Sequence, residues 1–295
     1  MMNSYIPDRE VRGLWSTLFH GIKKASLHPS IIGLLYIINL FFAFVMMGPL
    51  SNTLTKATAR TNFHNGFSEG FDHTLFMELM HHFGAAMTIS LLLALSLIIP
   101  YLIWSIFSAG GVIGIIDNHK NLKPSEAFWL GGSKFFFRYL YVVVVELLIL
   151  SIVLAILFFA LRASGLNPLT MESEQPIINR VYFMGGILLF LVFLLSNFKE
   201  AIKVLIAKND TTSVIALIPR AVKVSLSRKI IGLSLVYIIV LLIISGIFFL
   251  LKSVVGDYLI PAVIVGQLYL IIRIGYKFAK TASFYSLINS KYTAA

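Results

Sequence analysis

Long apolar stretches separated by shorter polar segments make up most of the chain. Six of the stretches are about 20 residues long and nearly free of charge, which is the length that an α-helix needs to cross the hydrocarbon core of a bilayer. We therefore predict membrane spans at about 31–49, 85–108, 138–161, 181–198, 230–251 and 257–275. This pattern predicts an all-α, polytopic membrane protein in which residues 1–295 form a single membrane domain.

The composition agrees with a lipid surrounding. Hydrophobic residues make up 58% of the 295 residues and charged residues 13%, whereas soluble domains have about 45–50% and about 25%. A soluble fold could not cover so much apolar surface, which argues against a soluble enzyme. The chain has no cysteine, which excludes disulfides and thiolate metal sites.

The basic residues indicate which side of the membrane each segment occupies. Of the 24 Lys and Arg residues, 19 fall in segments 1–30, 109–138, 199–229 and 273–295. Because cytoplasmic segments carry an excess of Lys and Arg, we expect both termini in the cytoplasm, in a bacterial inner membrane, with residues 276–295 as a tail. The net charge of +11 lies beside the spans and not on a separate basic domain, so nucleic acid is not an expected partner.

A repeated unit precedes two of the outward spans. Residues 25–34 and 224–233 both contain Ser-Leu and, after three residues, Ile-Ile-Gly-Leu; a fainter copy centres on residues 132–134. Each copy runs in the same order, from a cytoplasmic amphipathic segment through a span, an external loop and a returning span. The six spans are therefore expected to form three pseudo-repeated hairpins. Such repeats occur in transporters and also arise by duplication in proteins that transport nothing.

Amphipathic helices are predicted on the cytoplasmic side, within residues 1–30 and near residues 124 and 211. In the first of them, apolar residues recur at helical spacing on one face and basic residues on the other. The apolar face holds Val11, Leu14, Trp15, Leu18, Phe19 and Ile22. Such helices lie in the membrane interface among anionic headgroups, so membrane lipids are an expected partner. They either brace the spans or frame a docking surface or lipid entrance.

Glu146 is the strongest candidate for a polar site inside the membrane. It stands within a run of valines and leucines, where a carboxylate is costly unless it is protonated or paired. Asn39, Gln267 and Arg273 lie at similar predicted depths, and together the four residues suggest a polar layer in the inner half of the bilayer. Glu146 either contributes to a site for a coupled ion or a polar substrate, or is a structural carboxyl bonded to a neighbouring helix. Arg273 is its possible partner, or else reaches out to the headgroups.

Prolines and glycines mark places where the spans bend or approach one another. Pro100 and Pro261 are expected to interrupt the second and sixth spans, because proline has no N–H to donate. Gly110, Gly111 and Gly114 near the end of the second span allow close helix contact. Packing within one chain or a homodimer would each explain these glycines.

The long external segment after the first span is rich in histidine and aromatic residues. Glu78, His81 and His82 fall at i, i+3 and i+4, and Asp72 and His73 lie close upstream. Nitrogen and carboxylate ligands of this kind suit zinc, but the spacing is not that of an HExxH helix, and solvated loop residues are the alternative. We expect no metal site here and no cofactor.

Catalytic patterns are absent from the sequence. It contains no nucleophile elbow, no P-loop, no dinucleotide-binding fingerprint and no paired acids with a histidine base. We therefore expect that the chain is not an enzyme.

The layout of six spans with cytoplasmic amphipathic stretches resembles uncharacterised bacterial six-helix inner-membrane families. Gly110-Gly111 before one cytoplasmic helix and Gly131-Gly132-Ser133-Lys134 after it share in the resemblance. The families include the membrane domain of some glycerophosphodiester phosphodiesterases and the YciC-like proteins. The resemblance covers most of the chain, implies no particular reaction and assigns no functional residue.

Two functions remain open on the sequence alone. The first is a non-catalytic accessory, scaffold or assembly component that acts with a protein partner or as a homo-oligomer. The second is a transporter or lipid-handling protein with a site around Glu146. We favour the first, because one buried acid is little evidence for transport.

Overall fold

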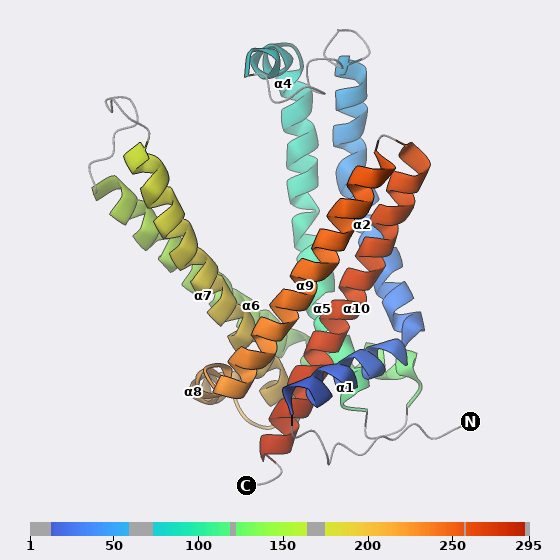
Figure 1. The fold of residues 1–295 in the computed structure, drawn as a ribbon, viewed down its shortest axis with the longest axis vertical. Coiled ribbons are helices and arrows are strands. Elements are labelled where there is room, and N and C mark those ends of the chain that lie inside the picture. Colours follow the sequence, from blue (N-terminus) through green and yellow to red (C-terminus); the bar gives the residue numbers. More distant parts are fainter. Residues whose placement is uncertain (1–12, 59–72, 119–121, 164–174, 257, 293–295) are drawn as a thin grey trace. The chain divides into compact units, whose positions relative to one another are not determined.

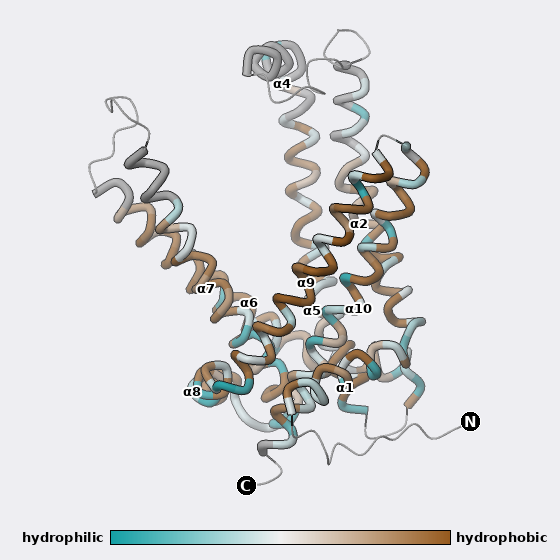
Figure 2. Tube along the Cα trace, in the orientation of Figure 1, coloured by the Kyte–Doolittle hydropathy of each residue, from teal (hydrophilic) through white to brown (hydrophobic). Residues whose placement is uncertain are grey.

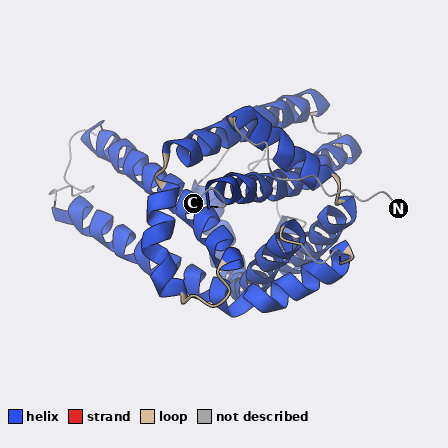
Figure 3. Cartoon of the chain, turned by 90° about the horizontal axis from the view of Figure 1, so that it is seen from below, coloured by secondary structure: helices blue, strands red, loops and turns tan. Residues whose placement is uncertain are grey.

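The computed structural model describes residues 13–58, 73–118, 122–163, 175–256 and 258–292. These residues form helices joined by short turns, with no strand among them (Figure 3). The predicted all-α class is confirmed for this part of the chain. Figure 1 gives the labels of the helices.

The helices belong to two compact units, and each is described by itself. The larger unit comprises Met1–Pro29 and Ile106–Ala295, and the smaller unit comprises Ser30–Ser105. The larger unit contains the end of α5 (Ile98–Ile116) and all of α1 (Leu14–Ser26), α6 (Pro124–Ala163), α7 (Gln175–Lys208), α8 (Val214–Ser225), α9 (Arg228–Val255) and α10 (Leu259–Tyr292).

The smaller unit contains a helix break that the sequence explains. Its helices are α2 (Pro29–Thr58), α4 (His73–Ser96) and the first residues of α5. Leu97 separates α4 from α5. Pro100 accounts for this break, because in an unbroken helix its ring would collide with the carbonyl of Ser96, and it has no N–H to donate to that carbonyl.

Within the described residues, five helical stretches are long and apolar enough to cross a membrane. They are Pro29–Gly48, Thr88–Ile116, Pro124–Ala160, Arg228–Val255 and Ile260–Ser290. Figure 2 shows apolar residues following one another along α9 and the first half of α10. The chain is therefore a multi-pass membrane protein. The remaining predicted span, 181–198, lies inside α7, and its crossing of the membrane stays a prediction.

The second half of α10 is the centre of the larger unit. Nearly every side chain from Phe278 to Ile288 is buried, and Phe284 has no exposed surface. α1 lies across this half of α10 (Figure 1) and packs on it. Residues 276–292, the described part of the predicted cytoplasmic tail, therefore continue α10 and pack in the unit, and their side of the membrane stays a prediction. Hydropathy falls after Arg273, but small and aromatic side chains still pack on all sides of the helix.

Pro261 does not interrupt the last span, contrary to expectation. It is the third residue of α10 and lies in the first turn of that helix. The N–H groups of a first turn have no partner within the helix, so proline is accommodated there without a break. Of the two prolines predicted to interrupt spans, Pro100 alone coincides with an interruption.

The two clear copies of the repeat form the same joint between helices. In the first, Leu27 N–H donates to the Lys23 carbonyl at 3.2 Å, and His28 N–H donates to the Ala25 carbonyl at 3.1 Å. In the second copy, Leu226 N–H donates to the Val222 carbonyl at 3.1 Å, and Ser227 N–H donates to the Val224 carbonyl at 3.0 Å. Ser26 and Ser225 each also donate to the carbonyl three residues before them. The fainter third copy lies within α6, which continues through it without a joint.

The glycines near the end of the second predicted span pack within the chain. A Cβ atom on Gly114 would lie 2.5 Å from the Ala127 carbonyl oxygen, and one on Gly131 would lie 2.6 Å from the Gly114 Cα. Gly110 faces the Gly131 carbonyl in the same way. These glycines therefore bring the backbones of α5 and α6 into contact.

The crossing of α1 over α10 gives a test of the core. We expect Gly21→Ala to lower the unfolding free energy by about 1–3 kcal/mol, because its Cβ would lie 2.5 Å from the Ala279 carbonyl oxygen. The matched control is Gly33→Ala in α2, where a Cβ meets no atom within 4 Å. The measurement is thermal unfolding of both purified variants in one detergent. Equal unfolding temperatures for the two variants would contradict the described crossing.

Candidate functional site

Helices α6 and α7 of the larger unit bring opposite charges together inside the protein. Glu146 on α6 accepts a hydrogen bond from Lys199 on α7, with 2.9 Å between Oε2 and Nζ. The Glu146 side chain is 14% exposed, and that of Lys199 is 40% exposed. The other carboxylate oxygen, Oε1, is buried and accepts no hydrogen bond from the described residues. Lys199 therefore balances the charge of a largely buried carboxylate.

Glu200, the next residue of α7, joins α7 to α10. Lys203 donates to its Oε1 at 3.0 Å, and Thr281 of α10 donates to its Oε2 at 3.1 Å. The side chains of Glu200 and Lys203 are each 12% exposed. Lys280 of α10 donates to the Ser196 hydroxyl of α7 at 3.1 Å. Charged and hydroxyl groups therefore link these two helices.

The pKa of Glu200 is lowered from its ordinary value of 4.5. Burial alone would raise this pKa, but the positive charges of Lys203 and Lys280 and the hydrogen bonds from Lys203 and Thr281 lower it by more. The ionised carboxylate is therefore the form that the folded protein favours. Its pairing stabilises the protein above pH 4.5, and this contribution is lost as the pH falls through the lowered pKa.

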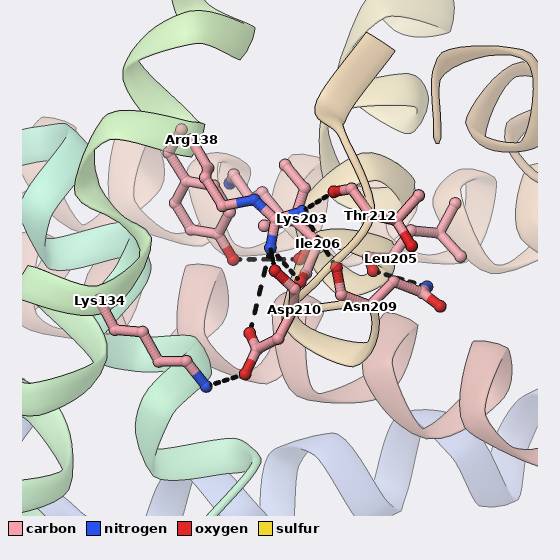
Figure 4. Close-up of polar contacts among 9 residues, drawn as sticks. Lys134, Arg138, Lys203, Leu205, Ile206, Asn209, Asp210 and Thr212 are labelled. Carbon is pink, nitrogen blue, oxygen red and sulfur yellow. Dashed lines mark hydrogen bonds and ion pairs between the residues drawn. The ribbon is translucent and has the colours of Figure 1, made fainter. Parts of the chain in front are cut away.

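Arg138 of α6 closes the carboxyl end of α7 (Figure 4). Its guanidinium donates to the backbone carbonyls of Ile206 at 3.2 Å, Asn209 at 3.0 Å, Asp210 at 3.2 Å and Thr212. The end of a helix leaves its last carbonyls without partners, and the negative end of its dipole favours a cation. Arg138 meets both needs at once.

Hydroxyl groups extend the polar contacts to α9 and α1. Ser234 of α9 donates to the Asn197 side chain of α7. Ser283 of α10 donates to the Thr17 carbonyl of α1 at 2.9 Å. Because Ser283 donates its proton there, Tyr237 of α9 is the donor in their 2.8 Å hydrogen bond. These bonds connect α7 with α9, α9 with α10, and α10 with α1.

The structure brings together a different set of residues from the predicted polar layer. Glu146 lies in the polar contact between α6 and α7, but its partner there is Lys199 and not Arg273, which is exposed. Gln267 is half-buried on α10, and Asn39 belongs to the smaller unit. Lys199 was missed because it follows the predicted end of a span. The apolar residues just after it, all of them buried within α7, were the available signal that the helix continues: Ala201, Ile202, Val204, Leu205, Ile206 and Ala207.

The candidate metal ligands gain no support from the structure. Asp72 lies outside the described residues, as do the side chains of His73, Glu78 and His82, although these three belong to α4. The side chain of His81 is exposed. In the described part of the chain, no group of three or more His, Cys, Asp or Glu side chains could hold a metal ion.

No family model, no curated protein and no solved structure matches the chain. The resemblance in layout to six-helix inner-membrane families stays a prediction.

The hydrogen bonds that Arg138 donates at the end of α7 lead to a stability prediction. We expect Arg138→Lys to lower the unfolding free energy by about 2 kcal/mol or more, because lysine cannot reach four carbonyls from one planar group. The control is Lys134→Gln, which breaks the ion pair with Asp210 (Figure 4), whose side chains are 45% and 48% exposed. Exposed pairs contribute little, so this variant should unfold close to the wild type. Thermal unfolding in detergent distinguishes the two. A larger loss of stability in Lys134→Gln than in Arg138→Lys would contradict the role assigned to Arg138.

Glu200→Gln tests the charged link between α7 and α10. Above pH 4.5 we expect the variant to unfold at a lower temperature than the wild type, because Lys203 and Lys280 lose their counter-charge. As the pH falls from 4.5 through the lowered pKa of Glu200, the carboxylate becomes protonated first in the unfolded and then in the folded protein, and the difference should shrink. Unfolding temperatures measured from about pH 7 downward check this, with Glu126→Gln at an exposed position as the control. A difference that stays constant with pH would exclude the assigned role.

Proposed function

We propose that the chain is a non-catalytic accessory, scaffold or assembly component of a bacterial inner membrane. The observation that supports this most is the use made of its interior charges. Lys199 pairs with Glu146, Lys203 and Thr281 hold Glu200, and Arg138 holds the end of α7. Apart from the pair of Lys203 and Glu200, which lies within α7, these contacts hold neighbouring helices together. A catalytic or transport site needs groups that are free to exchange partners.

The proposed topology has six spans and cytoplasmic termini. It takes residues 181–198 of α7 as the sixth crossing, and it rests on the excess of Lys and Arg on one side of the spans. The hairpin pairs α6 with α7 and α9 with α10 pack on each other. The matching joints at Leu27 and Leu226 support an origin of the hairpins by duplication.

The exposed face of α1 supports a place in the membrane interface. Leu18 is buried in the larger unit, whereas Trp15 and Phe19 are 67% and 65% exposed. With Ile22, these exposed residues form a stripe at helical spacing, and Lys23 near the end of the helix is exposed as well. Tryptophan and a basic residue on one helix are typical of helices at the headgroup level. α1 would then brace the core of the unit against the inner leaflet.

A transport or lipid-handling role is the second candidate. One observation favours it: Oε1 of Glu146 is buried without a hydrogen bond, while its partner Lys199 is partly exposed. A carboxylate of this kind could exchange a proton or a cation if Lys199 moved away.

Reconstitution in proteoliposomes separates the two candidates. We expect that vesicles with the wild-type chain hold an imposed proton gradient as long as empty vesicles do. We also expect native mass spectrometry of the protein in mild detergent to show a stoichiometric second chain, either another protein or a further copy. Proton flux that is abolished by Glu146→Gln, in a variant that unfolds at the wild-type temperature, would replace the accessory role with transport.

A further inference from the structure

Positive charge is in excess where α7 and α10 meet. α7 presents two lysines one turn apart, and α10 presents three basic residues at i, i+4 and i+7. They are Lys199, Lys203, Arg273, Lys277 and Lys280. Among the described residues, the carboxylates of this cluster are Glu146 and Glu200, so five cations lie near two anions. A cluster that is partly removed from water requires compensation for such an excess.

The two carboxylates are already engaged, and this leaves part of the cluster unbalanced. Glu146 is bonded to Lys199, and Glu200 is bonded to Lys203. Neither Arg273 nor Lys277 forms an ion pair with a described residue. The charges of Arg273, Lys203 and Lys199 all act against the charge on Lys277, and Glu200 is the described carboxylate that acts in its favour. The cluster therefore has room for a further anion.

The position of the cluster identifies the kind of anion. Arg273 and Lys277 are both exposed, and they stand where the apolar part of α10 ends. The exposed side chains just before them are apolar, namely Leu268, Leu270, Ile271 and Ile272. A phospholipid presents the matching sequence of groups, with acyl chains in the hydrocarbon and a phosphate at its edge. Basic groups between helices at this level suit anionic headgroups.

We propose that Arg273 and Lys277 bind the phosphate-bearing headgroup of an anionic phospholipid, whose acyl chains lie along the exposed apolar face of α10. The guanidinium of Arg273 would take two phosphate oxygens in a bidentate contact, and Lys277 would supply a point charge. The lipid then supplies the negative charge that the cluster lacks. This role needs only that the chain lies in a membrane, and it stands apart from the accessory function.

The test uses the full chain in nanodiscs of phosphatidylcholine, with increasing fractions of phosphatidylglycerol. We expect phosphatidylglycerol to raise the unfolding temperature and to be retained in native mass spectra. In Arg273→Gln/Lys277→Gln, the half-saturating fraction should rise about 30-fold, which is about 2 kcal/mol at about 1 kcal/mol per cation. Without anionic lipid, the same variant should be at least as stable as the wild type, because repulsion among the cations is relieved.

A matched variant distinguishes a site from general attraction to a charged surface. Lys223→Gln/Lys229→Gln removes two exposed cations near the joint between α8 and α9, and it should keep the wild-type response. An equal loss in both double variants would overturn the site. A further arm adds inorganic phosphate to pure phosphatidylcholine nanodiscs. The same stabilisation by free phosphate would show an anion site that is not specific to lipid. Absence of any effect of phosphatidylglycerol would also overturn the proposal.

Discussion

A charge that is removed from water must be met by an opposite charge or by aligned dipoles, and this constraint determines how α6, α7 and α10 are held together. Glu146 of α6 is met by Lys199 of α7, and Glu200 of α7 is met by Lys203 of the same helix and by Thr281 of α10. Arg138 is met by carbonyls at the end of α7. α7 thus supplies partners to both of its neighbours. The apolar surfaces of these helices could slide past one another, whereas the charged contacts specify one register.

The buried half of α10 depends on the same arrangement. Its hydroxyl and small residues allow α1, α7 and α9 to approach closely, and its contacts with them include hydrogen bonds as well as packing. The close approach at Gly21 shows how little space separates α1 from α10. A helix of this kind is specific in its orientation, because a rotation would bury Thr281 or Ser283 without partners.

Hydropathy predicted most of the fold, because the cost of leaving apolar runs in water depends on composition and not on neighbours. The helical class, five long apolar helices, the break before Pro100 and the amphipathic α1 followed from local patterns. The role of residues 276–292 did not, because their burial comes from helices distant in the sequence. The pairing of Glu146 with Lys199 was missed for the same reason. A sequence shows that a buried acid needs a partner, but the helix that supplies it depends on packing.

The contact between α1 and α10 joins two segments that the ribosome synthesises at very different times. Ser283 and the Thr17 carbonyl that it bonds are separated by 266 positions along the chain. A ribosome delivers the amphipathic first helix long before the segment that will cover its inner face. During that interval α1 can rest on the bilayer surface, where its aromatic stripe is already suited to lie. Docking is then a late event of biogenesis, and a chain that stops short of α10 would leave α1 uncovered for quality-control proteases to recognise.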